Sequence, residues 1–232
     1  MSSQDPNLAK VELIARALSD LRGKVVFVGG CSVGMLLTDT GAAPARVTYD
    51  VDLISQVTAL NGFYQLEREF EKLGFKRDMT KDAPICRWQY QGIEVDLMPT
   101  DPHILGFSNC WYPTVVQTAK LLELPSGNTI QIISAPAFIA TKFEAFSDRG
   151  KGDLMASHDL EDIINVVDGR PELLKEIAAS PADLITYLRE KTTQLLSMTQ
   201  FNDALSGMIF PDEFLAERML IVHKRLTEIS QL

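Results

Sequence analysis

The chain has 232 residues with a formal net charge of −9, and 46% of its residues are hydrophobic. This composition is typical of a globular protein with a full core, which needs no disulfide or metal ion in order to fold. The negative charge argues against a broad surface that coats nucleic acid, because phosphate binding requires clustered lysine and arginine.

Neither a targeting segment nor a membrane helix is predicted. No apolar run reaches the roughly 18 residues of a membrane span. The N-terminal MSSQDPNLAK has no basic segment followed by an apolar stretch. Cys31, Cys86 and Cys110 are odd in number and show no paired spacing, which favours reduced thiols. We therefore expect a cytoplasmic protein without a membrane partner.

The first part of the chain alternates between helical and extended patterns. Apolar residues at helical spacing predict an amphipathic helix over 7–21. The run KVVFV, residues 24–28, predicts a short buried strand that GGCS interrupts. A helix with Ser32 as its cap follows. After the loop 40–46, VTYDVDLI, residues 47–54, predicts a second strand.

Two hairpins are predicted further along. Residues 61–74 form an amphipathic pattern closed by a glycine, which predicts a helix. The strand-like runs 85–90 and 93–99 are joined by Gln91-Gly92, a short hairpin connection. The runs 114–125 and 129–133 flank Ser-Gly-Asn, a second hairpin signal.

The second half is predicted to be helical. Helical patterns cover 136–148, 157–169, a segment opening at 180–183, and 212–230. We therefore expect an α/β (α+β) fold, with a small mixed β-sheet and flanking helices followed by a helical half. The predicted domains are 1–134, the α/β core, and 135–232, a helical domain that completes a ligand cleft.

The strand VTYDVDLI carries two aspartates, Asp50 and Asp52, in an apolar run. Residues i and i+2 of a strand face the same side, so the two carboxylates project together. Their repulsion is relieved by a cation, and carboxylates prefer hard cations such as Mg²⁺. The alternative is a pair of exposed aspartates on the solvent-facing side of an edge strand, without a bound metal ion.

Two neighbouring features favour the metal site. Gly29 and Gly30 end an apolar strand and permit a close backbone approach, and the helix that follows offers N–H groups to an anion. Asp96 is a third carboxylate, on a strand that we expect to pair near the first. Each feature alone is common, whereas their order along the chain is specific.

This order of Gly-Gly, Asp-x-Asp and a later strand aspartate resembles the polymerase-β-like nucleotidyltransferase superfamily. The segment ATKFEAFSDRGKGDLMASHDLEDI, residues 140–163, resembles AbiEii-type nucleotidyltransferases, the toxins of abortive-infection systems. The resemblance covers roughly residues 24–170. It implies a Mg²⁺-dependent transfer of a nucleotide from an NTP to a hydroxyl group.

The resemblance also implies roles for individual residues. Two Mg²⁺ ions, or Mn²⁺ in their place, would be held by Asp50, Asp52 and Asp96, with Asp96 on the ion nearer the attacking hydroxyl. The nucleotide would be contacted by Gly29, Gly30, Ser32 and Lys142. For Lys142 the alternative is an exposed helix lysine. Residues expected to support the site or the acceptor are Arg46, Arg149, Lys151, Asp153 and Asp159. For Arg149 and Lys151 the alternative is a solvated loop, and for Asp153 and Asp159 it is a role in favouring the helix start near His158.

The sequence is compatible with more than one function. The acceptor implied is the end of a tRNA or another RNA, or a protein side chain, and a toxin would have a cognate antitoxin. A second hypothesis is an antibiotic-modifying nucleotidyltransferase, in which an acidic pocket binds a cationic aminoglycoside. A third is a non-catalytic member that only binds a nucleotide, although the presence of all three carboxylates argues against it.

Overall fold

The computed structural model describes residues 5–57, 59–149, 154 and 156–232. The chain divides into two compact units, which are described separately. Pro6–Ser32 and Arg46–Ser134 form the sheet unit, and Val33–Ala45 and Ala135–Leu232 belong to the helical unit. The segment Val33–Ala45 thus groups with the helices, although the sequence analysis assigned it to the α/β core.

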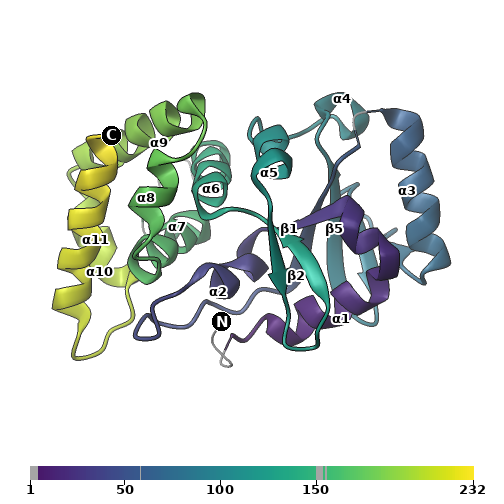
Figure 1. Ribbon diagram of the computed structural model, residues 1–232, viewed down its shortest axis with the longest axis horizontal. Coiled ribbons are helices and arrows are strands. Elements are labelled where there is room, and N and C mark those ends of the chain that lie inside the picture. The colour runs from purple at the N-terminus through teal and green to yellow at the C-terminus, as the bar shows by residue number, and fades with distance from the viewer. Residues whose placement is uncertain (1–4, 58, 150–153, 155) are drawn as a thin grey trace. The chain divides into compact units, whose positions relative to one another are not determined.

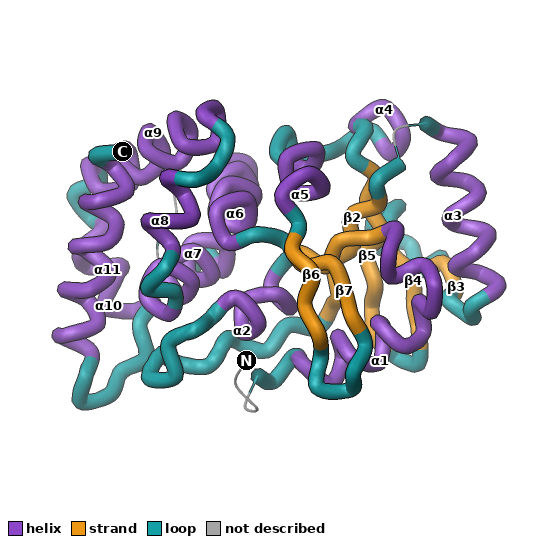
Figure 2. Tube along the Cα trace, viewed as in Figure 1, coloured by secondary structure: helices purple, strands orange, loops and turns teal. Residues whose placement is uncertain are grey.

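The sheet unit contains one mixed sheet of seven strands with helices around it (Figures 1 and 2). The strands are β1 (Val25–Val28), β2 (Asp50–Ser55), β3 (Lys76–Arg77), β4 (Arg87–Tyr90), β5 (Ile93–Pro99), β6 (Lys120–Glu123) and β7 (Thr129–Ile132). The helices are α1 (Leu8–Leu18), α3 (Leu60–Lys72), α4 (Pro102–Leu105) and α5 (Tyr112–Thr118), with 3-10 turns at Ser19–Lys24 and Gly30–Ser32.

The strand order is β3-β4-β5-β2-β1-β7-β6. The pairs β2–β5 and β1–β7 are parallel, and the other neighbours are antiparallel. The hairpin predicted between β4 and β5 is confirmed, with Tyr90 opposite Ile93. Gln91 and Gly92 have φ angles of 48° and 81°, as a two-residue turn of this kind requires.

The sheet is held by an apolar core on the face opposite the aspartates. Val51 and Leu53 alternate with Asp50 and Asp52 and are fully buried. Behind β4, the buried Trp88 packs near Phe70, with ring centroids 5.7 Å apart. One face of β2 is therefore anchored in the core, which fixes the direction in which the aspartates leave the strand.

Two predicted elements differ from the structure. Residues 114–118 were expected to be extended but belong to helix α5, which has a proline in its first turn and buries Val115. Helix α2 (Val33–Leu36) begins directly after Ser32, as predicted, but the Ser32 hydroxyl does not cap it. Ser32 ends a 3-10 turn, and its buried Oγ has no hydrogen-bond partner among the described residues.

The helical unit consists of seven helices within the described residues (Figure 1). They are α2 (Val33–Leu36), α6 (Ala135–Arg149), α7 (His158–Gly169), α8 (Leu173–Ala178), α9 (Ala182–Ser197), α10 (Phe201–Met208) and α11 (Leu215–Ser230). The predicted class, a mixed sheet with flanking helices and a helical second half, is confirmed. In the described part of the chain, no helix combines the length and the apolar character that crossing a membrane requires.

Polar contacts attach the segment Val33–Ala45 to the other helices of its unit. The backbone N–H groups of Thr38 and Asp39 donate to the carbonyl oxygen of Gly169, at 2.9 and 3.0 Å. Arg218 of α11 pairs with the Asp39 carboxylate at 2.7 Å. These contacts satisfy the carbonyl at the end of α7, and they explain why the segment groups with helices distant in sequence.

Candidate metal centre

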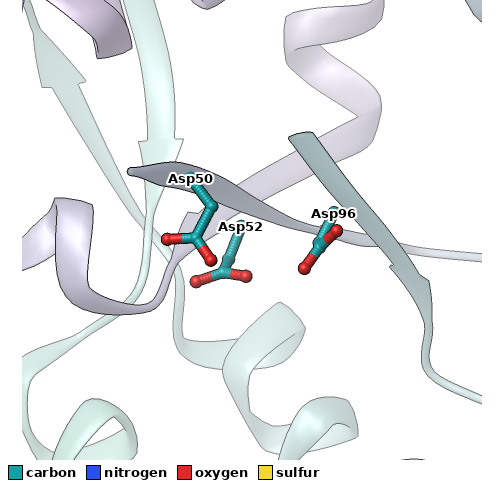
Figure 3. A group of neighbouring side chains, drawn as sticks. All are labelled: Asp50, Asp52 and Asp96. Carbon is teal, nitrogen blue, oxygen red and sulfur yellow. The ribbon is translucent and has the colours of Figure 1, made fainter. Parts of the chain in front are cut away.

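The parallel pairing of β2 and β5 places the carboxylates side by side. Asp52 lies opposite Asp96, and Asp50 lies opposite Glu94. Residues paired in register share a face of the sheet, so all four side chains leave the same side. Figure 3 shows Asp50 and Asp52 projecting from one strand, with Asp96 beside them on its neighbour. One oxygen from each of the three aspartates lies within 4.8 Å of the other two.

The donor set suits a hard divalent cation. Oxygens that share one Mg²⁺ lie at most about 4.2 Å apart, twice the usual Mg–O distance, so small side-chain rotations suffice here. The side chains of Asp50 and Asp96 are 36% and 11% exposed, which places the cluster at the edge of the core with access from solvent. The three aspartates predicted as ligands therefore come together in a geometry that fits Mg²⁺ or Mn²⁺.

Arg87 is a cation in this cluster that was not predicted from the sequence. Its Nε donates to Oδ1 of Asp96 at 2.9 Å, and its Nη2 donates to Oδ2 at 2.8 Å. The same Nη2 lies 3.6 Å from Oδ2 of Asp50, and Nη1 pairs with Oε2 of Glu94 at 2.5 Å. Hydrogen bonding to Asp96 raises the pKa of Arg87 above its ordinary value, so the guanidinium stays charged.

The predicted hairpin contained the signal for Arg87. Once Gln91-Gly92 is the turn, Tyr90 faces Ile93, and counting outward places Arg87 opposite Asp96. The same count places Glu94 on the aspartate face, two residues before Asp96. The hairpin register, carried outward from its turn, is therefore the signal that identifies both residues.

Gly29 is required by the position of Asp52. Its φ angle is +69°, which favours glycine. A Cβ atom built on Gly29 would lie 1.7 Å from Oδ2 of Asp52. The glycine therefore makes room for the carboxylate, a physical role separate from the phosphate contact that the resemblance implies.

We expect Gly29→Ala to lower the free energy of unfolding by about 2–3 kcal/mol, since backbone strain of about 1 kcal/mol adds to the clash with Asp52. Gly127→Ala is the matched control, because Gly127 has φ +80° and, among the described residues, no neighbouring atom within 4 Å of where a methyl group would lie. Urea denaturation of both variants separates the two contributions. Equal losses in the two variants would contradict a steric role for Asp52.

Two buried thiols border the aspartates and stay neutral. Burial, followed by the charge of Asp52, raises the pKa of the Cys31 thiol to about 12. Burial, followed by the charge of Asp96, raises the pKa of Cys86 to about 12 as well. Neither thiol is a thiolate nucleophile near neutral pH, so the reactive groups of this face are its carboxylates.

Ser32 and Arg46, two further predicted site residues, also lie in the sheet unit. Ser32 is fully buried, and its backbone N–H already donates to the carbonyl of Gly29 at 3.1 Å. Arg46 precedes β2, and its carbonyl oxygen accepts a hydrogen bond from Asn7 at 2.9 Å. The phosphate contacts predicted for Gly29, Gly30 and Ser32, and the supporting role predicted for Arg46, stay predictions.

Lys142 belongs to the helical unit and is buried, in contrast to the exposed lysine considered as its alternative. Its Nζ lies 3.0 Å from Oδ1 of Asp159 and 2.7 Å from Oδ2 of Asp162, both on α7. The exposed fractions of the Lys142 and Asp162 side chains are 10% and 0%. Asp159 thus contacts Lys142 directly. Arg149 is the last residue of α6, and Lys151 and Asp153 lie outside the described residues.

Comparisons with known proteins return only distant structural likenesses. No protein-family model matches the sequence, and no curated protein is significantly similar to it. The chain is similar to an antigenic nucleotidyltransferase-like protein from Paracoccidioides brasiliensis, with 21% identity, coverage of 90% of this chain and 95% of the other, and a TM-score of 0.49.

Two further solved structures are similar at lower identity. ANT(2")-Ia, solved in complex with adenylyl-2"-tobramycin, is 14% identical, with coverage of 80% of this chain and 98% of the other and a TM-score of 0.47. JHP933 from Helicobacter pylori is 14% identical, with coverage of 100% and 94% and a TM-score of 0.48. At such identities and TM-scores, these likenesses carry no conclusion about what this chain does.

Proposed function

We propose that this protein is a Mg²⁺-dependent nucleotidyltransferase, which moves a nucleoside monophosphate from an NTP to an acceptor hydroxyl. The observation that carries the proposal is the convergence of Asp50, Asp52 and Asp96 on one face of the sheet, where one oxygen of each lies within 4.8 Å of one oxygen of the other two. The three carboxylates carry more negative charge than the one Arg87 guanidinium beside them offsets, and a triphosphate substrate supplies further ligands for a divalent ion.

The three aspartates would hold Mg²⁺ or Mn²⁺, and the bound ion would neutralise the triphosphate and lower the pKa of the acceptor hydroxyl. Asp50 and Asp52 leave the same strand, so their backbone positions are fixed relative to each other and only side-chain rotation is needed to bring their carboxylates together. Asp96, from the adjacent strand, is the carboxylate proposed to lie nearest the acceptor and to take its proton. The main task of these residues is to position reactants and balance charge.

The proposed acceptor is the end of a tRNA or another RNA, or a protein side chain. This choice, and a role as an AbiEii-type toxin with an antitoxin partner, rest on the sequence resemblance of residues 140–163. The net charge of −9 favours an acceptor recognised by local contacts over one held by a broad basic surface.

The test is transfer of label from α-³²P-labelled NTPs in the presence of Mg²⁺. Separate reactions contain total tRNA, a cell protein extract, and a panel of aminoglycosides, so that the labelled product identifies the acceptor class. We expect label on RNA or protein, and loss of labelling with EDTA. If label is found only on an aminoglycoside, the protein is an antibiotic-modifying nucleotidyltransferase instead. Absence of label in every reaction, despite NTP binding, would indicate a non-catalytic protein.

A further inference from the structure

Arg87 occupies the space between two of the proposed metal ligands. Its Nη2 lies 2.8 Å from Oδ2 of Asp96 and 3.6 Å from Oδ2 of Asp50. Its Nε donates to the second oxygen of Asp96 at 2.9 Å. One guanidinium thus engages both oxygens of Asp96 and approaches an oxygen of Asp50.

A guanidinium in this position and a divalent cation use the same oxygens. The guanidinium makes a bidentate contact with Asp96. It therefore occupies the lone-pair directions in which both carboxylate oxygens would best coordinate a metal ion. Nη2 also carries positive charge, so a divalent ion placed between Asp50 and Asp96 would be repelled at short range. The two cations therefore compete for the same position.

Glu94 provides a further partner for the guanidinium. Its Oε2 lies 2.5 Å from Nη1 of Arg87, a different nitrogen from the two that donate to Asp96, and its side chain is 37% exposed. The Arg87 side chain is 19% exposed. The guanidinium can therefore withdraw from the two aspartates toward solvent while it keeps one ion pair.

We infer that Arg87 is the internal counter-ion of the metal-free site, and that metal loading is an exchange in which Nη2 leaves Asp50 and Asp96 while Glu94 retains the guanidinium. The inference rests on the proposed function and deepens it, because it names the residue that sets the affinity of the site for divalent ions. The guanidinium also offsets the mutual repulsion of Asp50, Glu94 and Asp96, which share one face of the sheet.

The decisive variant is Arg87→Met, studied in the full chain by thermal melting without metal and by calorimetric titration with Mn²⁺. Without metal we expect a lower melting temperature than in the wild type, because Asp50, Glu94 and Asp96 lose the cation that contacts them. For Mn²⁺ we expect a dissociation constant about tenfold smaller than that of the wild type, because the competing charge is gone.

Arg77→Met is the matched control. Arg77 lies on the adjacent strand β3, opposite Trp88 in register and so on the other face of the sheet from Arg87. It pairs with Glu67 and stacks over the Trp88 ring, 4.9 Å from its centroid. Its loss should lower the melting temperature and leave the Mn²⁺ dissociation constant unchanged.

Arg87→Lys covers the case in which Arg87→Met does not fold. Lysine keeps the positive charge but cannot make the bidentate contact of a guanidinium. Mn²⁺ should therefore bind more tightly than in the wild type, by a smaller factor than in Arg87→Met. If the wild type binds Mn²⁺ measurably and the folded Arg87 variants bind it no more tightly than the wild type does, the inference is wrong. That result would leave the proposed function standing. If the wild type binds neither Mn²⁺ nor Mg²⁺, the proposed function fails and the exchange fails with it.

Discussion

Asp52→Asn should lower the rate of nucleotidyl transfer at least about a thousandfold, because the variant loses a metal-binding carboxylate at the centre of the cluster. Asp52 lies between β1 and β5, opposite Val28 on one side and Asp96 on the other. The amide is nearly the same size as the carboxylate, so the fit against Gly29 is retained. The measurement is kcat/KM for the labelled-NTP reaction at saturating Mg²⁺.

The metal-free Asp52→Asn protein should keep its fold, with a melting temperature equal to or slightly above that of the wild type. Removing one of several like charges relieves repulsion. Glu123→Gln is the control for the chemical change, because Glu123 is an exposed carboxylate on the edge strand β6 of the same sheet. A large loss of stability in metal-free Asp52→Asn would show that Asp52 is structural.

Lys142→Met should lower the free energy of unfolding of the helical unit by about 3–5 kcal/mol, because it removes a buried cation that contacts the buried carboxylate of Asp162 and the partly buried carboxylate of Asp159. Lys142 lies within 3.0 Å of Asp159 and 2.7 Å of Asp162, and the Asp162 side chain is fully buried. Burial alone would lower the pKa of Lys142, but the charges of Asp162 and Asp159 outweigh it and raise the pKa above its ordinary value. The lysine is therefore charged at neutral pH.

Lys224→Met is the control for this prediction. Lys224 lies on helix α11 of the same unit, and its ion pair with Glu228 is 4.0 Å long with a 76% exposed lysine side chain. Its loss should change the unfolding free energy by less than about 0.5 kcal/mol. Urea denaturation followed by circular dichroism measures both variants. A Lys142→Met loss as small as that of Lys224→Met would contradict a structural ion pair.

The stability effect changes how the proposed nucleotide role of Lys142 must be tested. An exposed lysine could be replaced without harm to the fold, but this one is buried. A triphosphate contact still predicts a raised KM for NTP in Lys142→Met, measured below the lowered melting temperature. An unchanged KM would show that Lys142 does not contact the triphosphate and only holds α6 and α7 together.

Features that depend on local geometry could be predicted from the amino-acid sequence. Alternation along a strand places Asp50 and Asp52 on one face wherever that strand lies in the sheet. The Gln91-Gly92 turn sets the β4–β5 register, because a two-residue loop requires these left-handed conformations. The helical character of α6, α7, α9 and α11 follows from their apolar periodicity and first-turn residues.

Contacts between segments far apart in the chain required the folded structure. The parallel pairing of β2 with β5 joins strands about forty residues apart, and no local pattern sets their register. The three aspartates could be predicted to share a site, but the structure was needed to show that Asp52 lies directly opposite Asp96. The burial of Lys142 depends on the packing of α6 against α7, since a lysine on a lone helix reaches solvent. The contacts of Thr38 and Asp39 with Gly169 likewise arise from long-range packing, because backbone groups left unpaired at a helix end accept any donor that the fold brings within reach.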